Sequence, residues 1–74
     1  MIEFYKTNLQ HHFDAIRIKE LLQKEFPEAQ FQFDLLHPDK LLRVEGKSVP
    51  VSRVVQLIKY EGFYCAVVET KLDR

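Results

Sequence analysis

The fold of this chain is decided by one continuous stretch, Phe31-Gln32-Phe33-Asp34-Leu35-Leu36-His37-Pro38-Asp39-Lys40-Leu41-Leu42-Arg43-Val44-Glu45. Apolar and polar residues alternate strictly over its first five positions, which is typical of a half-buried β-strand. Residues 41–45 read as a second strand that returns beside the first. Between them, His37-Pro38-Asp39-Lys40 favours a turn, because proline fixes φ and aspartate suits turn positions. The stretch therefore predicts a β-hairpin.

A helical pattern lies on each side of this hairpin. Before it, apolar residues recur at helical spacing from Asp14 onward, lysine and glutamate fill the other face, and Pro27 ends the helix. After it, Gly46 breaks the strand, Pro50 suits the entrance of a second helix, and an apolar stripe ends at Gly62. The apolar positions are Ala15, Ile18, Leu21 and Leu22 in the first helix, and Val51, Val54, Val55 and Ile58 in the second.

Two further strands are predicted near the ends of the chain. Ile2-Glu3-Phe4-Tyr5-Lys6 alternates apolar and polar residues, and Phe63 to Thr70 reads as the last strand. The order βαββαβ predicts an α+β, ferredoxin-like sandwich, a four-stranded antiparallel sheet with two helices on one face. Right-handed crossovers place the first and third strands at the centre. The core is expected to contain Phe4, Ile18, Leu22, Phe33, Val44, Val55, Ile58 and Val68.

Length and composition predict one small domain, residues 1–74. The eleven basic and eleven acidic residues cancel and are spread along the chain, so we expect neither nucleic acid nor a membrane as partner. The chain starts without the pattern of a signal peptide, the lone Cys65 cannot form an internal disulfide, and no apolar stretch could span a bilayer. The expected compartment is therefore the cytoplasm.

Several motifs follow one another in a recognisable order. They are Phe4-Tyr5-Lys6-Thr7-Asn8-Leu9-Gln10, His37-Pro38-Asp39-Lys40, Leu42-Arg43-Val44-Glu45 and Gly62-Phe63 followed by Ala66. This order resembles the heavy-metal-associated domains of copper chaperones and metal-pumping ATPases, most closely their small single-domain bacterial members. Those members often run Phe-x-Lys-Thr-Asn, two more residues and Cys-x-x-Cys, then an Asn-Pro-Asp-Lys turn and a Leu-x-Val-Glu strand. The Gly62 motif carries one residue more than the usual Gly-aromatic-x-Ala.

The departure from that family falls on its metal site. His11 and Asp14 stand where the family has its two cysteines, and His12 and Phe13 stand where small residues usually lie. Two thiolates hold a soft copper(I) ion, and neither thiolate exists here, so transfer of copper(I) is not expected. The family docks its protein partners with the same end of the molecule, where the loop that carries its metal site lies. The resemblance therefore implies a docking surface, for which Phe13 and Phe63 are the candidates.

Two interpretations of His11, His12 and Asp14 stay open. In the first, imidazole nitrogens and a carboxylate form a harder site that binds zinc, nickel, cobalt or divalent copper. In the second, Asp14 caps or begins the first helix, where the helix dipole favours a negative group, and the histidines are solvated loop residues. A cation at the positive end of a helix needs anionic ligands to offset the dipole, and one carboxylate offsets less than two thiolates.

Three other motifs each have a structural interpretation and a functional one. The tripeptide His37-Pro38-Asp39 also occurs in J-domains, but there it joins two helices, whereas strands flank it here. Cys65 fits a small apolar filler of the last strand, or a thiol that reaches the His11 loop if the strand bulges. Phe31 and Phe33 could stack RNA bases, but the strand at 41–45 lacks the basic-Gly-aromatic run of such a surface, so we expect both in the core.

Two classes of function remain. The first is a heavy-metal-associated-type domain without the cysteine site that docks a protein partner through the His11 loop end, with no certain cofactor and a divalent zinc, nickel or copper ion as candidate ligand. The second is a small-molecule-sensing or dimerising regulatory module without a metal role. Neither is an enzyme, because no nucleophile stands beside a base and residues 9–13 lack a phosphate-cradling glycine loop. We expect a monomer or a weak homodimer.

Overall fold

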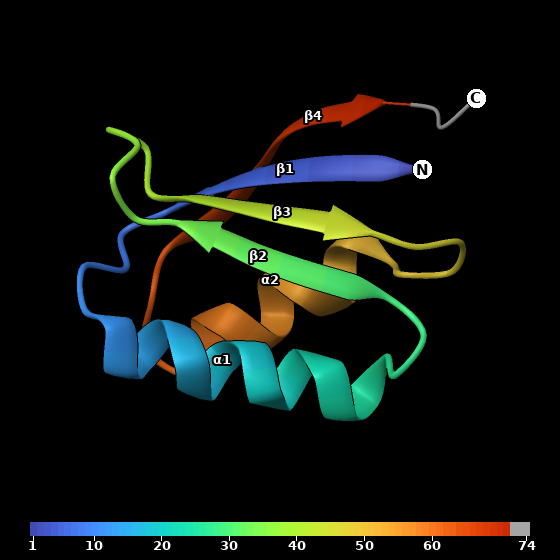
Figure 1. The fold of residues 1–74 in the computed structure, drawn as a ribbon, viewed down its shortest axis with the longest axis horizontal. Coiled ribbons are helices and arrows are strands. Elements are labelled where there is room, and N and C mark those ends of the chain that lie inside the picture. Colours follow the sequence, from blue (N-terminus) through green and yellow to red (C-terminus); the bar gives the residue numbers. More distant parts are fainter. Residues whose placement is uncertain (72–74) are drawn as a thin grey trace.

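A computed structural model describes residues 1–71 as one sheet with two helices against one of its faces (Figure 1). The strands are β1 (Ile2–Thr7), β2 (Gln30–Asp34), β3 (Leu41–Glu45) and β4 (Cys65–Lys71), and the helices are α1 (His12–Glu25) and α2 (Val51–Tyr60). All strand pairs are antiparallel, in the order β2-β3-β1-β4. The predicted α+β ferredoxin-like fold, with β1 and β3 at the centre, is confirmed. Residues 72–74 of the predicted domain lie outside the described residues.

The hairpin and the glycine after the second helix form as the sequence predicts. β2 and β3 pair over five positions, from Gln30 opposite Glu45 to Asp34 opposite Leu41. Gly62 has a φ of 94°, in the left-handed region that favours glycine. The N–H groups of Gly62 and Phe63 then bond the carbonyl oxygens of Lys59 and Ile58, which closes α2 with a Schellman motif. After this turn the chain continues into β4.

The core lies between the helices and the inner face of the sheet, and four of the predicted core residues are fully buried there: Ile18, Leu22, Val44 and Ile58. Phe33 and Val55 lie at its margin, whereas their neighbours Phe31 and Val54 are buried. No helix among the described residues has the length and apolar character needed to cross a membrane.

Two core predictions, Phe4 and Val68, are wrong. In β1 the inward-facing residue is Tyr5, which lies opposite the buried Leu42, whereas Phe4 lies opposite Arg43 on the uncovered face of the sheet. Each face of β1 carries an aromatic residue, Phe4 on one and Tyr5 on the other, so the alternating pattern alone did not show which face is buried. The pairing of β1 with β4 shifts by one residue between Phe4 and Tyr5. This bulge leaves Val68 unpaired and 54% exposed.

The inward face of β1 also carries a buried polar pair. The hydroxyl of Tyr5 donates to the Oε1 atom of Glu3 at 3.0 Å, and both side chains are buried. Burial, and then the neighbouring carboxylate of Glu3, raise the pKa of Tyr5 well above its ordinary value. The hydroxyl therefore stays protonated and remains a donor to Glu3.

Replacing Tyr5 by phenylalanine should lower the free energy of unfolding by about 1–3 kcal/mol, because the Glu3 side chain would stay buried without this donor. Urea unfolding followed by circular dichroism measures the loss. Tyr64→Phe is the matched control, since Tyr64 is exposed and should tolerate the change. Equal stability of the wild type and Tyr5→Phe would contradict the role of this pair.

The raised pKa of Tyr5 also gives a pH dependence. A group whose pKa is raised in the folded state stabilises the fold fully at any pH below its pKa in the unfolded chain, which is 10.0 for tyrosine. This stabilisation is lost as the pH rises above that pKa, because the unfolded chain then loses the proton more readily than the folded one. Wild-type stability should therefore fall above pH 10 more steeply than that of Tyr5→Phe.

Candidate functional site

Three loops meet at one end of the molecule. They are the β1–α1 connection (residues 8–11), the β2–β3 turn (residues 35–40) and the α2–β4 connection (residues 61–64). Figure 1 shows all three on the left side of the ribbon, the side at which α1 begins. We call this region the loop end. It contains the positions that the sequence predicts for metal binding and for docking.

Thr7 ties the first of these loops to the second. Its N–H donates to the carbonyl oxygen of Asp39 at 3.0 Å, and its hydroxyl donates to the carbonyl oxygen of Lys40 at 2.7 Å. The same hydroxyl accepts the N–H of Leu9 at 3.2 Å, and the side chain of Leu9 is fully buried. The buried hydroxyl both donates and accepts a hydrogen bond, and it therefore holds the two loops in one arrangement.

Asn8 joins the third loop to the other two. Its Oδ1 atom accepts the N–H of Tyr64 at 2.9 Å. Nearby, Arg17 and Glu61 form an ion pair of 2.7 Å, which connects α1 with the end of α2. Thr7 and Asn8 belong to the motif that resembles the heavy-metal-associated family, and in this chain their hydrogen bonds organise the loop end.

The first helix begins at His12, two residues before the predicted start at Asp14. His11 is the N-cap residue, with extended backbone angles (φ −113°, ψ 137°), and its carbonyl oxygen accepts the N–H of Ala15 at 3.1 Å. The side chain of His11 forms no capping hydrogen bond. Asp14 is thus the third residue of the helix and neither begins it nor holds the N-cap position, although its negative charge in the first turn suits the helix dipole.

The predicted metal ligands lie on this first turn. His11 and His12 are exposed, and Asp14 is half-buried. Among residues 1–71, no three histidine, cysteine, aspartate or glutamate side chains are brought together in a way that could hold a metal ion. The structure therefore does not assemble His11, His12 and Asp14 into a three-ligand site. Imidazole and carboxylate donors also do not suit copper(I), which prefers thiolates.

Cys65 is a core residue, as the filler interpretation predicts. It pairs with Thr7 in the sheet and its side chain is buried in the hydrophobic cluster. Burial raises the pKa of the thiol to about 11, so the reactive thiolate is scarce at neutral pH. The bulge of β4 comes further along the strand, at Val68, and does not alter the pairing of Cys65 with Thr7.

Large apolar side chains are exposed around the loop end. Phe13 in the first turn of α1 is 86% exposed, Tyr60 at the end of α2 is 87% exposed, and Leu36 in the β2–β3 turn is 97% exposed. Tyr64 is also exposed, whereas the predicted docking residue Phe63 packs partly against the core. We refer to Phe13, Tyr60 and Tyr64, three exposed aromatic residues on elements that meet at the loop end, as the aromatic patch.

The sequence analysis named Phe13 but missed Tyr60, Tyr64 and Leu36. A signal for Tyr60 was present, because this residue lies off the apolar stripe that runs through Val54 and Ile58. Leu36 lies in the same β2–β3 turn as Asp39 and Lys40, whose carbonyl oxygens bond Thr7.

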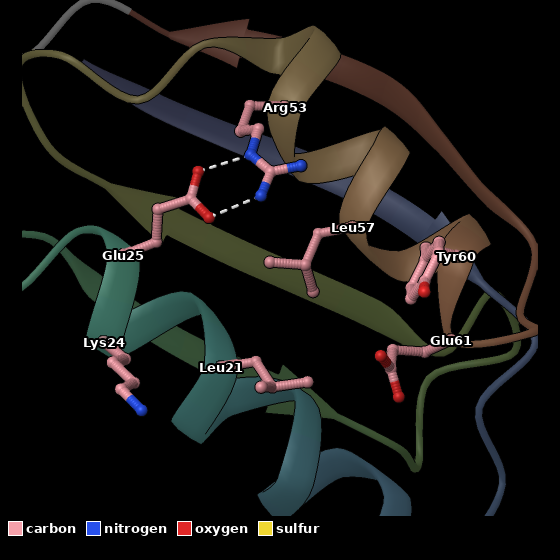
Figure 2. Close-up of a pocket in the computed structure, with 7 residues that line it drawn as sticks. All are labelled: Leu21, Lys24, Glu25, Arg53, Leu57, Tyr60 and Glu61. Carbon is pink, nitrogen blue, oxygen red and sulfur yellow. Dashed lines mark hydrogen bonds and ion pairs between the residues drawn. The ribbon is translucent and has the colours of Figure 1, made fainter.

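A groove lies between the two helices (Figure 2). Leu21 and Leu57 lie between the helices, and the groove has a volume of about 370 Å³. One end is closed by Arg53 and Glu25, which pair through two hydrogen bonds, one of them 2.7 Å from Nη2 to Oε1. This bond holds the pKa of the Glu25 carboxyl below its ordinary value. Tyr60 lies at the other end, so the groove and the aromatic patch share a residue.

The geometry defines the chain as a ferredoxin-like α+β domain with a braced loop end. Comparison with family models, with curated proteins and with solved structures finds no match for this chain. The resemblance to heavy-metal-associated domains therefore rests on the sequence motifs quoted above alone.

Proposed function

We propose that this chain is a protein-interaction domain of the heavy-metal-associated type, in which the loop end docks a protein partner and the cysteine copper site has been lost. The observation that carries the proposal is the aromatic patch: Phe13 and Tyr60 are almost fully exposed at the helix ends that adjoin the loops held by Thr7 and Asn8. Aromatic residues are enriched in the cores of protein interfaces, and tyrosine is a frequent anchor.

The bracing of the loop end supports this function on energetic grounds. Binding costs entropy when loops must be ordered, and a surface that is already fixed avoids that cost. Here hydrogen bonds of Thr7 and Asn8 fix the three loops. Thr7 donates to the backbone carbonyl oxygens of Asp39 and Lys40, and Asn8 accepts the backbone N–H of Tyr64. The balance of basic and acidic residues gives no field that would favour nucleic acid or a lipid surface over a protein. The cytoplasm remains the expected compartment for such a partner.

The double variant Phe13→Ser with Tyr60→Ser should capture at least about tenfold less of the partner from an extract of the cells that express the protein, because loss of one interface anchor already costs more than about 1 kcal/mol. Immobilised wild type and variant are compared at equal load by quantitative mass spectrometry. Both side chains are exposed, so the fold should persist, which circular dichroism checks.

The control for this experiment is Val67→Ser with Val68→Ser, which removes two exposed apolar side chains from β4. The control should retain the partner. A partner retained equally by the patch variant and the wild type would rule out docking through the aromatic patch.

Weak divalent metal binding at His11, His12 and Asp14 is a second proposal for the same loop. It is supported by the exposure of both histidines beside a carboxylate in the first turn of α1. If bound there, zinc, nickel or copper(II) would be held by imidazole nitrogens and the carboxylate.

Titration of the wild type with zinc should give saturable NMR shifts confined to residues 10–14 and Phe63, and Asp14→Ala should weaken them. Absence of shifts at millimolar zinc, nickel and copper(II) would remove the metal from the account. Partner capture in the presence of a chelator separates the two proposals, since docking through the aromatic patch needs no metal.

A further inference from the structure

β2 is an unprotected edge of the sheet. Among the described residues it has a strand on one side only, and it pairs with β3 through five successive positions without a register shift. Its sequence, Gln30-Phe31-Gln32-Phe33-Asp34, contains no proline, glycine, lysine or arginine. Edge strands are commonly blocked by such residues or by a bulge, because their free N–H and C=O groups can pair with another chain. The opposite edge, β4, does carry a bulge.

The sequence of β2 is also suited to pair with a second copy of itself. It is nearly palindromic about Gln32: in an antiparallel pair centred there, Phe31 lies opposite Phe33 of the other copy, and Gln30 lies opposite Asp34. Aromatic pairs directly opposite one another stabilise antiparallel strands, and an amide can donate a hydrogen bond to a carboxylate. Such a pairing places no like charges opposite one another.

The flank of α1 beside this edge offers a second, independent observation. α2 lies on one flank of α1, where Leu21 and Leu57 line the groove. On the other flank, the side chain of Gln23 bonds the carbonyl oxygen of Ala29 at 2.8 Å, directly before β2. Ile16 lies two helical turns before Gln23 on the same flank and is 56% exposed. Phe33, on the inner face of β2, is only half-buried.

We propose that this chain forms a homodimer through β2, with the two β2 strands antiparallel and the two-fold axis at Gln32. The two sheets then join into one of eight strands, with all four helices on the same face. Backbone hydrogen bonds hold the two β2 strands together. On the helix-covered face of this pair, the side chains of Phe33 and Ile16 become more buried. Cyclic two-fold association requires one surface that complements itself, which the palindrome provides.

The arrangement leaves the two loop ends free. Because the β2 strands run in opposite directions, the loop ends lie at opposite sides of the dimer. The dimer would thus present two copies of the aromatic patch, and two linked sites gain avidity for a partner that offers two epitopes. The dimer itself does not rest on the docking proposal, and its test uses the purified chain alone.

Sedimentation equilibrium between about 10 µM and 1 mM tests the dimer. The wild type should pass from the mass of one chain to that of two over this range. Gln32→Lys should stay at the mass of one chain, because the two lysines would face each other across the axis as like charges. Gln10→Lys is the matched control, an exposed glutamine outside the strands, and should dimerise as the wild type does. A monomeric wild type at 1 mM, or a dimer unaffected by Gln32→Lys, would overturn the proposal.

A cysteine cross-link tests the register independently. Directly opposite residues in an antiparallel pair have Cα atoms about 4.5–5.5 Å apart, within the span of a disulfide. Gln32→Cys should therefore form a disulfide-linked dimer under mild oxidation. Gln30→Cys should form far less, because Gln30 faces Asp34 rather than itself. The wild type controls for Cys65, which is buried. Absence of a cross-link in Gln32→Cys would exclude this register.

Discussion

The hydroxyl group of Thr7 is the contact on which the rest of the loop end depends. It donates to the carbonyl oxygen of Lys40 and accepts the N–H of Leu9, and the neighbouring Asn8 side chain accepts the N–H of Tyr64. The bonds of Thr7 with Lys40 and of Asn8 with Tyr64 join segments that are 33 and 56 residues apart in the chain. Loops usually contribute mobility at a protein surface, and here their positions are instead set by the last residues of a central strand.

This bracing gives the Thr7-Asn8 pair a structural role in this chain. In the family that the chain resembles, the loop after this motif carries the metal. In this chain Thr7 and Asn8 connect the end of β1 with the β2–β3 turn and with the α2–β4 connection. His11 and Asp14 offer no soft donor, and neither residue takes part in the hydrogen bonds of Thr7 and Asn8. A frame of this kind can present exposed side chains to a partner.

Much of the fold could be predicted from the sequence, because the decisive patterns were unambiguous. The hairpin at residues 31–45, Pro50 before α2 and Gly62 after it each admit one structure. The side of β1 that faces the core was not predictable, since Phe4 and Tyr5 are adjacent aromatics and only pairing with β3 selects Tyr5. The bulge at Val68 has no local signal of this kind.

The candidate site was less accessible to sequence reasoning. Helix α1 starts at His12 without a capping side chain, so no capping residue marked its first position, and Asp14 seemed the natural start. The aromatic patch combines residues from α1 and from both ends of the α2–β4 connection, which only the tertiary fold brings to one end. Phe13 was identified through the family resemblance, whereas Tyr60 and Tyr64 required the structure.

Amide hydrogen exchange at Thr7, Leu9 and Tyr64 tests most directly whether the loop end is a braced surface. These three N–H groups bond to Asp39, to the Thr7 hydroxyl and to Asn8, respectively. The account predicts that they exchange as slowly as amides in the centre of the sheet, and that Thr7→Val accelerates exchange at Leu9 while the sheet stays protected. Exchange in the wild type as fast as in an unfolded chain would mean that the three loops move independently, and it would contradict the account.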